Sequence, residues 1–118
     1  MDILTYKSQL QENVIAPMTE FMNECEDCGF TEEDVAKCEA LLLEYFSALE
    51  DMVTPSNREI MHCVMNLVLA LNQLNEDTDY CMIETMEREA ICELIQESAL
   101  AFGLTDAEDD ITEEWREW

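Results

Sequence analysis

Residues 54–75 read TPSNREIMHCVMNLVLALNQLN, and this stretch decides the fold class. Aliphatic residues recur in it at spacings of three and four, the pattern of one helix face: Ile60, Val64, Leu67, Leu71 and Leu74. Other apolar residues fill much of the remaining circumference, and residues 55–75 hold one acid and one base. An uncharged helix that is apolar nearly all round is typical of a buried position. We therefore expect a helix that starts near Thr54-Pro55, with Thr54 as the N-cap and Pro55 at the first helical position, and that forms the central element of a bundle.

Two amphipathic helices are expected before this stretch. The first spans about residues 2–28 and ends at Gly29. Pro17 lies inside it and either kinks the helix or splits it in two, because proline removes one backbone hydrogen bond. The second spans about residues 32–52 and follows Thr31, a residue type that favours the N-cap position.

One main helix and a C-terminal segment are expected after it. The helix spans about residues 85–102. Short connections favour antiparallel neighbours, so the sequence predicts an all-α protein, an antiparallel bundle of four main helices over residues 1–104. An acidic, tryptophan-containing segment over residues 105–118 is expected to dock on the bundle and to form a short helix from Thr112.

Charge is the dominant feature of the composition. Twenty-nine Asp and Glu residues face five Lys and Arg residues, a formal net charge of −24 over 118 residues. This charge argues against direct binding of nucleic acid or of an anionic membrane, because both require basic side chains. The longest apolar run, residues 60–71, is too short to span a bilayer. The acidity indicates a basic protein partner, binding of cations, or a coat that only confers solubility.

The cysteines indicate the compartment. Six are present, and the N-terminus lacks the basic segment and apolar stretch of a signal peptide. Disulfides are rare in the cytosol, so we expect reduced thiols and a cytoplasmic protein. Cys25 and Cys28 form a C-x-x-C pair, but they lie among acids at a predicted helix C-terminus, which disfavours a reactive thiolate. A zinc site would need a second pair, so we predict structural thiols and no metal.

Catalytic and calcium-binding patterns are incomplete. His62 is the only histidine, and its neighbour Cys63 cannot face it across a helix, so a structural histidine is predicted. Three residues match the first ligand positions of an EF-hand loop: Asn75, Asp77 and Asp79. The match fails at Tyr80 and Met86, where the glycine and the bidentate glutamate of that loop belong. Paired carboxylates are too abundant for any one pair to be informative. We predict no enzyme, no cofactor and no metal site.

The C-terminal segment is the best candidate for a partner-binding site. It combines carboxylates with two tryptophans: Asp106, Glu108, Asp109, Asp110, Glu113, Glu114, Trp115, Glu117 and Trp118. Tryptophan is enriched at binding hot spots, and surrounding acids steer a basic partner. The alternative is that both tryptophans only dock the segment onto the bundle.

These observations together predict a small, acidic, helical binding protein, either a monomer or a homodimer. The most concrete version is an inhibitor or immunity-type protein against a nuclease or nucleic-acid-binding protein. In that version carboxylates imitate a nucleic acid and occupy the phosphate-binding groove of the target. The alternative is a specialised chaperone or secretion adaptor that presents an apolar groove to its client, and an exposed Met-rich or Leu-rich helix that dimerises would favour it.

Overall fold

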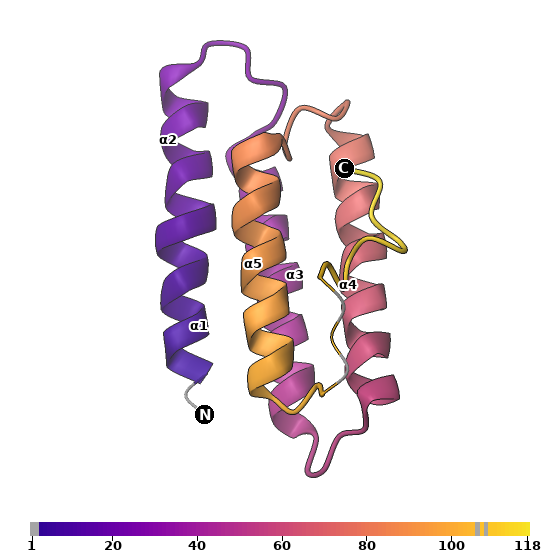
Figure 1. The fold of residues 1–118 in the computed structure, drawn as a ribbon. Helices are drawn as coiled ribbons and strands as arrows, with labels where there is room; N and C mark the ends of the chain where they lie inside the picture. Colours follow the sequence, from indigo (N-terminus) through magenta and orange to yellow (C-terminus); the bar gives the residue numbers. More distant parts are fainter. Residues whose placement is uncertain (1–2, 106, 108) are drawn as a thin grey trace.

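The computed structural model describes residues 3–105, 107 and 109–118 and confirms the all-α antiparallel bundle. Over these residues four helical rods run alternately up and down (Figure 1). The first rod comprises three elements, and each later rod is one helix: α1 (Ile3–Leu10), η1 (Gln11–Ile15), α2 (Ala16–Glu24), α3 (Glu32–Asp51), α4 (Asn57–Asp77) and α5 (Thr85–Ala101). No helix in the described part of the chain has both the length and the apolar character needed to span a bilayer.

The first rod stays helical through Pro17 because the turn before the proline widens. Residues 11–15 form the π-helical element η1, and the N–H of Ala16 donates to the carbonyl of Gln11, five residues back. A wider turn makes room for a proline ring that would clash with an ordinary α-helical turn. The expected kink or split at Pro17 is therefore a change of helix type within one continuous rod (Figure 1).

The loop after the first rod begins earlier than predicted. The rod ends at Glu24 because Cys25 is extended, so the predicted helical end at residue 28 is wrong. Gly29 lies within the loop, with a φ of +88° that favours glycine. A Cβ at this position would lie 2.7 Å from Cys81 Sγ. The glycine thus allows this loop to contact the loop between α4 and α5.

Reciprocal capping boxes set the starts of α3 and α4. The Thr31 hydroxyl accepts the N–H of Asp34, and the Asp34 carboxylate accepts the N–H of Thr31. Ser56 and Glu59 form the same pair at the start of α4. The predicted cap at Thr54 is therefore wrong, because the Ser-x-x-Glu pair two residues later satisfies two free backbone donors at once.

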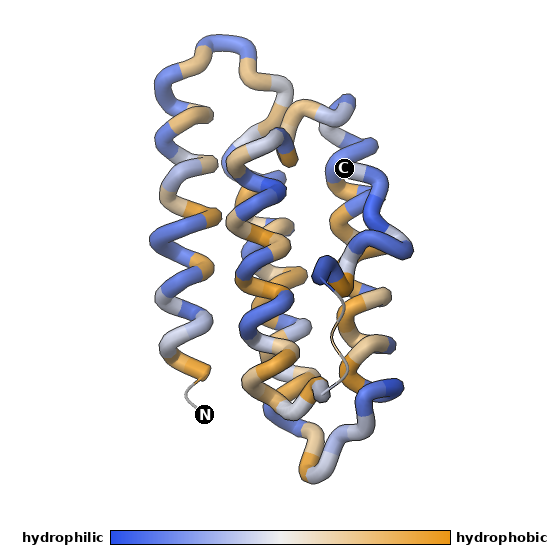
Figure 2. The backbone as a smooth tube through the Cα atoms, in the orientation of Figure 1, coloured by the Kyte–Doolittle hydropathy of each residue, from blue (hydrophilic) through white to orange (hydrophobic). Residues whose placement is uncertain are grey.

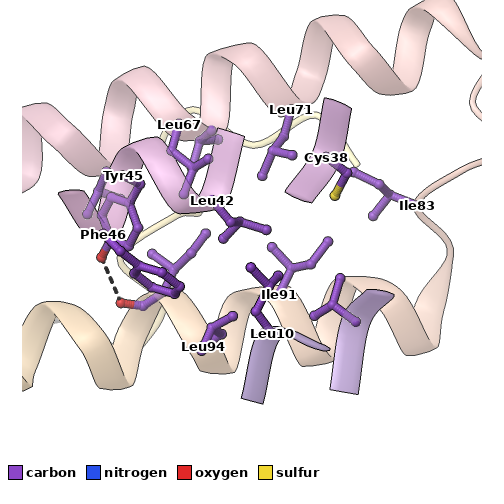
Figure 3. Close-up of a cluster of buried hydrophobic side chains, with 14 of the residues drawn as sticks. Leu10, Cys38, Leu42, Tyr45, Phe46, Leu67, Leu71, Ile83, Ile91 and Leu94 are labelled. Atoms are coloured by element: carbon purple, nitrogen blue, oxygen red, sulfur yellow. Dashed lines mark hydrogen bonds between the residues drawn. The ribbon is translucent and has the colours of Figure 1, made fainter. Parts of the chain in front are cut away.

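The core lies between the four rods (Figure 3). Its fully buried side chains come from every rod, and include Leu10, Leu42, Phe46, Leu71 and Ile91. The buried Tyr45 hydroxyl lies 3.1 Å from the Ser98 hydroxyl and donates to the carbonyl of Ile95 at 3.2 Å. Burial raises the pKa of Tyr45, with a smaller opposing effect of the Ser98 bond, so this polar link between α3 and α5 stays neutral.

The expectation that the helix over residues 54–75 is central is wrong. α3 packs against α1, α2 and α4, whereas α4 packs mainly against α3 and to a lesser extent against α5. Leu69 of α4 is 47% exposed, and Met61 and Met65 are partly exposed. Figures 1 and 2 show the mostly hydrophilic C-terminal segment crossing in front of α4 and reaching its outer edge. The apolar residues beyond the core face of α4 are thus covered only in part.

Candidate functional site

The carboxylates form an exposed acidic surface. No described Asp or Glu is buried, and the single ion pair among the described residues joins Arg116 to Asp110. Exposed acids occur on the first rod, on α3 and on α5: Glu12, Glu20, Glu24, Glu32, Glu33, Glu44, Glu50, Asp51, Glu89, Glu93 and Glu97. Internal pairing therefore neutralises very little of this charge, and a negative field extends into solvent around these rods.

The two tryptophans of the C-terminal segment lie half-buried against the bundle. Trp115 and Trp118 pack against the hydrophobic core. Asn72 of α4 donates its side-chain amide to the carbonyl of Trp115 at 2.8 Å and accepts the N–H of Glu117 at 3.0 Å. The two bonds to the Asn72 amide hold the backbone of the segment along α4. Because both tryptophans are half-buried, they expose less aromatic surface to a partner than free tryptophans would.

A clasp within the segment replaces the expected short helix. Residues 111–115 form turns, and the Asp110 carboxylate accepts the N–H of Thr112 at 2.9 Å and Arg116 Nη2 at 2.8 Å. Arg116 also donates to the carbonyl of Trp118 at 2.8 Å and lies 5.5 Å from its ring centre. Partial burial opposes ionisation of Asp110, but the bonds from Thr112 and the charge of Arg116 outweigh it and lower the pKa of Asp110.

The predicted binding residues therefore divide into three groups. Asp106 and Glu108 lie outside the described residues. Asp110, Trp115 and Trp118 take part in the clasp or in docking and are partly buried. The remaining four carboxylates are exposed: Asp109, Glu113, Glu114 and Glu117. These four form the part of the segment that is open to a charged partner.

An apolar groove on α4 was missed by the sequence analysis. Its volume is about 600 Å³, and we call it the α4 groove; it is lined by Met52, Arg58, Glu59, Met61, His62, Cys63, Met65 and Trp115. The end of α3 supplies Met52, and the C-terminal segment supplies Trp115. The sequence feature that could have predicted this groove is the near-continuous apolar circumference of residues 60–71, which we interpreted as complete burial. An apolar helix surface also occurs where a partner packs.

The thiols near these surfaces are not activated. All six cysteines lie in the described residues and are free. Burial raises the pKa of Cys38 to about 12, with a smaller contribution from the charge of Glu39. Burial, and then the charge of Glu59, raises the pKa of Cys63 in the α4 groove. A protonated thiol is a poor nucleophile. His62 is exposed beside Cys63, so the predicted structural histidine lies at the surface.

The remaining sequence motifs serve local structure. The Cys28 thiol donates to the carbonyl of Phe30 at 3.1 Å within the loop after α2. The Asn75 side chain is buried and accepts the N–H of Ile83 at 3.0 Å, which closes the loop before α5. Within the described ranges, no group of three or more His, Cys, Asp or Glu residues could hold a metal ion. Of the EF-hand-like residues, Asn75 thus shapes the loop before α5.

One of the comparisons with known proteins gives a match, and that match is to a protein family. A family model described as "Family of unknown function (DUF5713)" matches residues 14–118. No curated protein and no solved structure matches the chain. Since the matched residues include half of the first rod, all later helices and the C-terminal segment, the chain belongs to the family of unknown function DUF5713.

Proposed function

We propose that this protein is a non-catalytic, cytoplasmic binding protein that engages a basic protein partner through its acidic surface. The observation that carries the proposal is the uncompensated charge. A net charge of −24 lies on carboxylates of which none in the described ranges is buried, and Arg116–Asp110 is the one ion pair there. Such a field repels nucleic acid and accelerates encounter with a cationic surface.

The exposed end of the C-terminal segment is the proposed contact site. Glu113, Glu114 and Glu117 project from a backbone that Asn72 holds against α4. Fixed carboxylates lose less side-chain and backbone freedom on binding than a flexible acidic tail would, which favours affinity. In the most specific version, the partner is a nuclease or nucleic-acid-binding protein whose phosphate-binding groove these carboxylates occupy.

The test is affinity capture from native host extract with the full chain as bait. Basic proteins should bind at about 50 mM salt and elute by about 500 mM, because screening weakens contacts between exposed charges. The variant E113Q/E114Q/E117Q should release the partner at lower salt. The variant E89Q/E93Q/E97Q changes the charge equally on α5 and is the matched control. Equal effects of the two variants would show that the segment is not the contact site.

A captured partner also allows the proposed inhibition to be tested directly. A purified nuclease or nucleic-acid-binding partner should no longer bind DNA when an equimolar amount of this protein is added. If no basic protein is retained at low salt, or if the retained proteins resist about 1 M salt, the proposal is wrong, because charge would then not drive binding.

The α4 groove supports a second candidate function, a chaperone or secretion adaptor for an apolar client segment. Flexible methionine side chains suit a surface that accepts varied apolar partners, and Met52, Met61 and Met65 line this groove. A client of this kind would remain bound at high salt and would be lost in the variant Met65→Glu. A client that elutes with salt would contradict this candidate.

A further inference from the structure

The α4 groove is one end of a longer surface between α3 and α4. Two smaller depressions of about 170 and 370 Å³ continue it along the two helices. Cys63 lines both the α4 groove and the first depression, and Leu41 and Ala70 line both depressions. The three hollows therefore form one valley, which we call the α3–α4 seam. It extends from Arg58 at one end to Asp77 at the other.

The seam is nearly neutral on a strongly acidic molecule. The charged residues that line it are two basic and three acidic ones: Lys37, Arg58, Glu44, Glu59 and Asp77. The whole chain has only five Lys and Arg residues against 29 Asp and Glu residues. A basic partner is attracted most weakly to this face. For a second copy of the same acidic chain, it is the face with the least repulsion.

The charges along the seam also complement each other about a two-fold axis. Arg58 lies at the N-terminal end of α4, and Asp77 lies at its C-terminal end. In a two-fold interface, a contact between one residue and another is repeated with the two roles exchanged. If the α4 helices of two copies lie antiparallel, Arg58 of each copy faces Asp77 of the other, and the helix dipoles are also opposed favourably.

The size of the seam is sufficient for a dimer. α3 and α4 contain 20 and 21 residues. Two such helices side by side are about 30 Å long and about 20 Å wide, a projected face of roughly 600 Å². A stable interface buries about 800 Å² of accessible surface per partner, and a corrugated helical face has more accessible surface than its projection. The middle of the seam is apolar and partly exposed, with Leu41, Cys63 and Ala70.

We propose that the α3–α4 seam is a homodimer interface in which the α4 helices of two copies pack antiparallel across a two-fold axis. The apolar side chains of the α4 groove supply its stability, and the Arg58–Asp77 contacts set its direction. The acidic faces of the first rod and of α5 then point outward on both copies, so most of the charge of each copy stays in solvent.

The first test measures the molar mass of the full chain by light scattering and sedimentation, with concentrations up to about 100 µM. The chain has a mass of 13.7 kDa, and the expected species has twice that mass. Met65→Glu should raise the dissociation constant about 100-fold or more, because it places a charge among the apolar side chains of the α4 groove that the proposed interface buries. Leu100→Glu adds the same charge at an α5 residue that is 46% exposed and should leave the dimer intact. Circular dichroism verifies that both variants fold.

Salt and charge exchange sharpen the test. Raising the salt concentration from about 0.05 to about 0.5 M should lower the dissociation constant of the dimer, since salt screens the repulsion between two acidic chains. The same change should weaken the binding of a basic partner, because it screens the attraction between opposite charges. R58D and D77R should each weaken the dimer about fivefold, and the double variant should restore it. A parallel arrangement would give no such rescue.

Two results would overturn the proposal. One is a 13.7 kDa monomer at every salt and concentration, which would leave the seam to an apolar client segment. The other is a dimer that Met65→Glu leaves intact, which would place the interface on another face. Neither result affects the basic-partner proposal, because binding there is measured separately and depends on the carboxylates of the C-terminal segment.

Discussion

α3 and α4 agree in length, in how they start and on their inner faces, but their outer faces differ. They contain 20 and 21 residues, and each begins with a capping box. Leu42 of α3 and Leu71 of α4 are both fully buried. α3, however, carries seven carboxylates and one lysine, whereas α4 carries three carboxylates and one arginine. The two helices therefore have similar core faces, but the exterior of α3 is highly charged and that of α4 carries few charges.

The difference shows that the number of charged residues on a helix depends on every surface that the helix contacts, and not only on its packing in the core. The exposed acids of α3 face solvent. α4 contacts the C-terminal segment through Asn72, and its outer stripe forms the α4 groove with Met61 and Met65. An apolar outer face on an acidic protein thus indicates a surface that packs against something beyond the four-rod core.

The largest expected effects test whether the inner faces of α3 and α4 are equivalent. Leu42→Ala and Leu71→Ala should each lower the free energy of unfolding by about 2–5 kcal/mol, because each leaves a cavity at a fully buried site. Urea denaturation followed by circular dichroism measures the loss. Leu100→Ala, at a half-exposed site on α5, is the control and should change it by about 0.5 kcal/mol or less. A loss below about 1 kcal/mol for either buried leucine would contradict the equivalence.

The next effect tests the cover on the outer face of α4. Trp115→Ala should lower the free energy of unfolding by about 2 kcal/mol, roughly half the usual loss for a fully buried tryptophan, because Trp115 is half-buried. The same denaturation experiment measures it. Glu114→Ala changes the neighbouring exposed residue and should be nearly neutral. If both variants are equally stable, the segment contributes nothing to the outer face of α4.

A smaller and equal effect is expected at the two helix starts. Thr31→Ala and Ser56→Ala should each lower the free energy of unfolding by about 1 kcal/mol, because each removes an N-cap acceptor. Thr31→Ser keeps the hydroxyl and should retain most of the stability. Thermal unfolding monitored by circular dichroism compares the three variants. A loss at one helix only would mean that the two starts are not equivalent.

The smallest effect concerns the clasp that holds the C-terminal segment on α4. The pKa of Asp110 lies below its ordinary value of 3.8, so the clasp contributes stability above that pH and loses it as the pH falls through the lowered pKa. At pH 7, Asp110→Asn should cost about 1 kcal/mol or less, since the group is partly exposed.

The measurement follows tryptophan fluorescence during denaturation at several pH values. The difference in unfolding free energy between the original protein and Asp110→Asn should be constant near neutral pH and should shrink as the pH falls below 3.8 and through the lowered pKa. The comparison at each pH isolates the contribution of the Asp110 carboxylate. A difference that grows on acidification would reverse the assigned sign.

The elements that were predicted well are those with local causes. The spacing of Ile60, Val64 and Leu67 required a helix whatever its neighbours, and Thr31 identified the start of α3 because a cap involves residues three apart. Near Thr54 and Pro55 the same logic gave the wrong residue, since two candidate caps lay close together and only Ser56 had a glutamate at the third position.

The C-terminal segment was only partly predictable. Its acids and tryptophans were evident, but the bonds that hold it join Asn72 to residues 43 and 45 positions later. Periodicity does not report such contacts. The helix predicted at Thr112 is only a series of turns at residues 111–115, because the chain is held by Asn72 at Trp115 and Glu117.

The sequence by itself determined that this protein is an all-α bundle with an acidic exterior, because helix periodicity and side-chain charge are properties of neighbouring residues. Only the tertiary structure decided that α4 packs mainly against α3 and less against α5, and that Trp115 covers part of the apolar surface of α4 while the rest forms an open groove. These features depend on which helices pair and on where the chain returns after α5. A helix that is apolar nearly all round accommodates burial and an open binding face equally well, and the packing of distant residues determines which of the two it has.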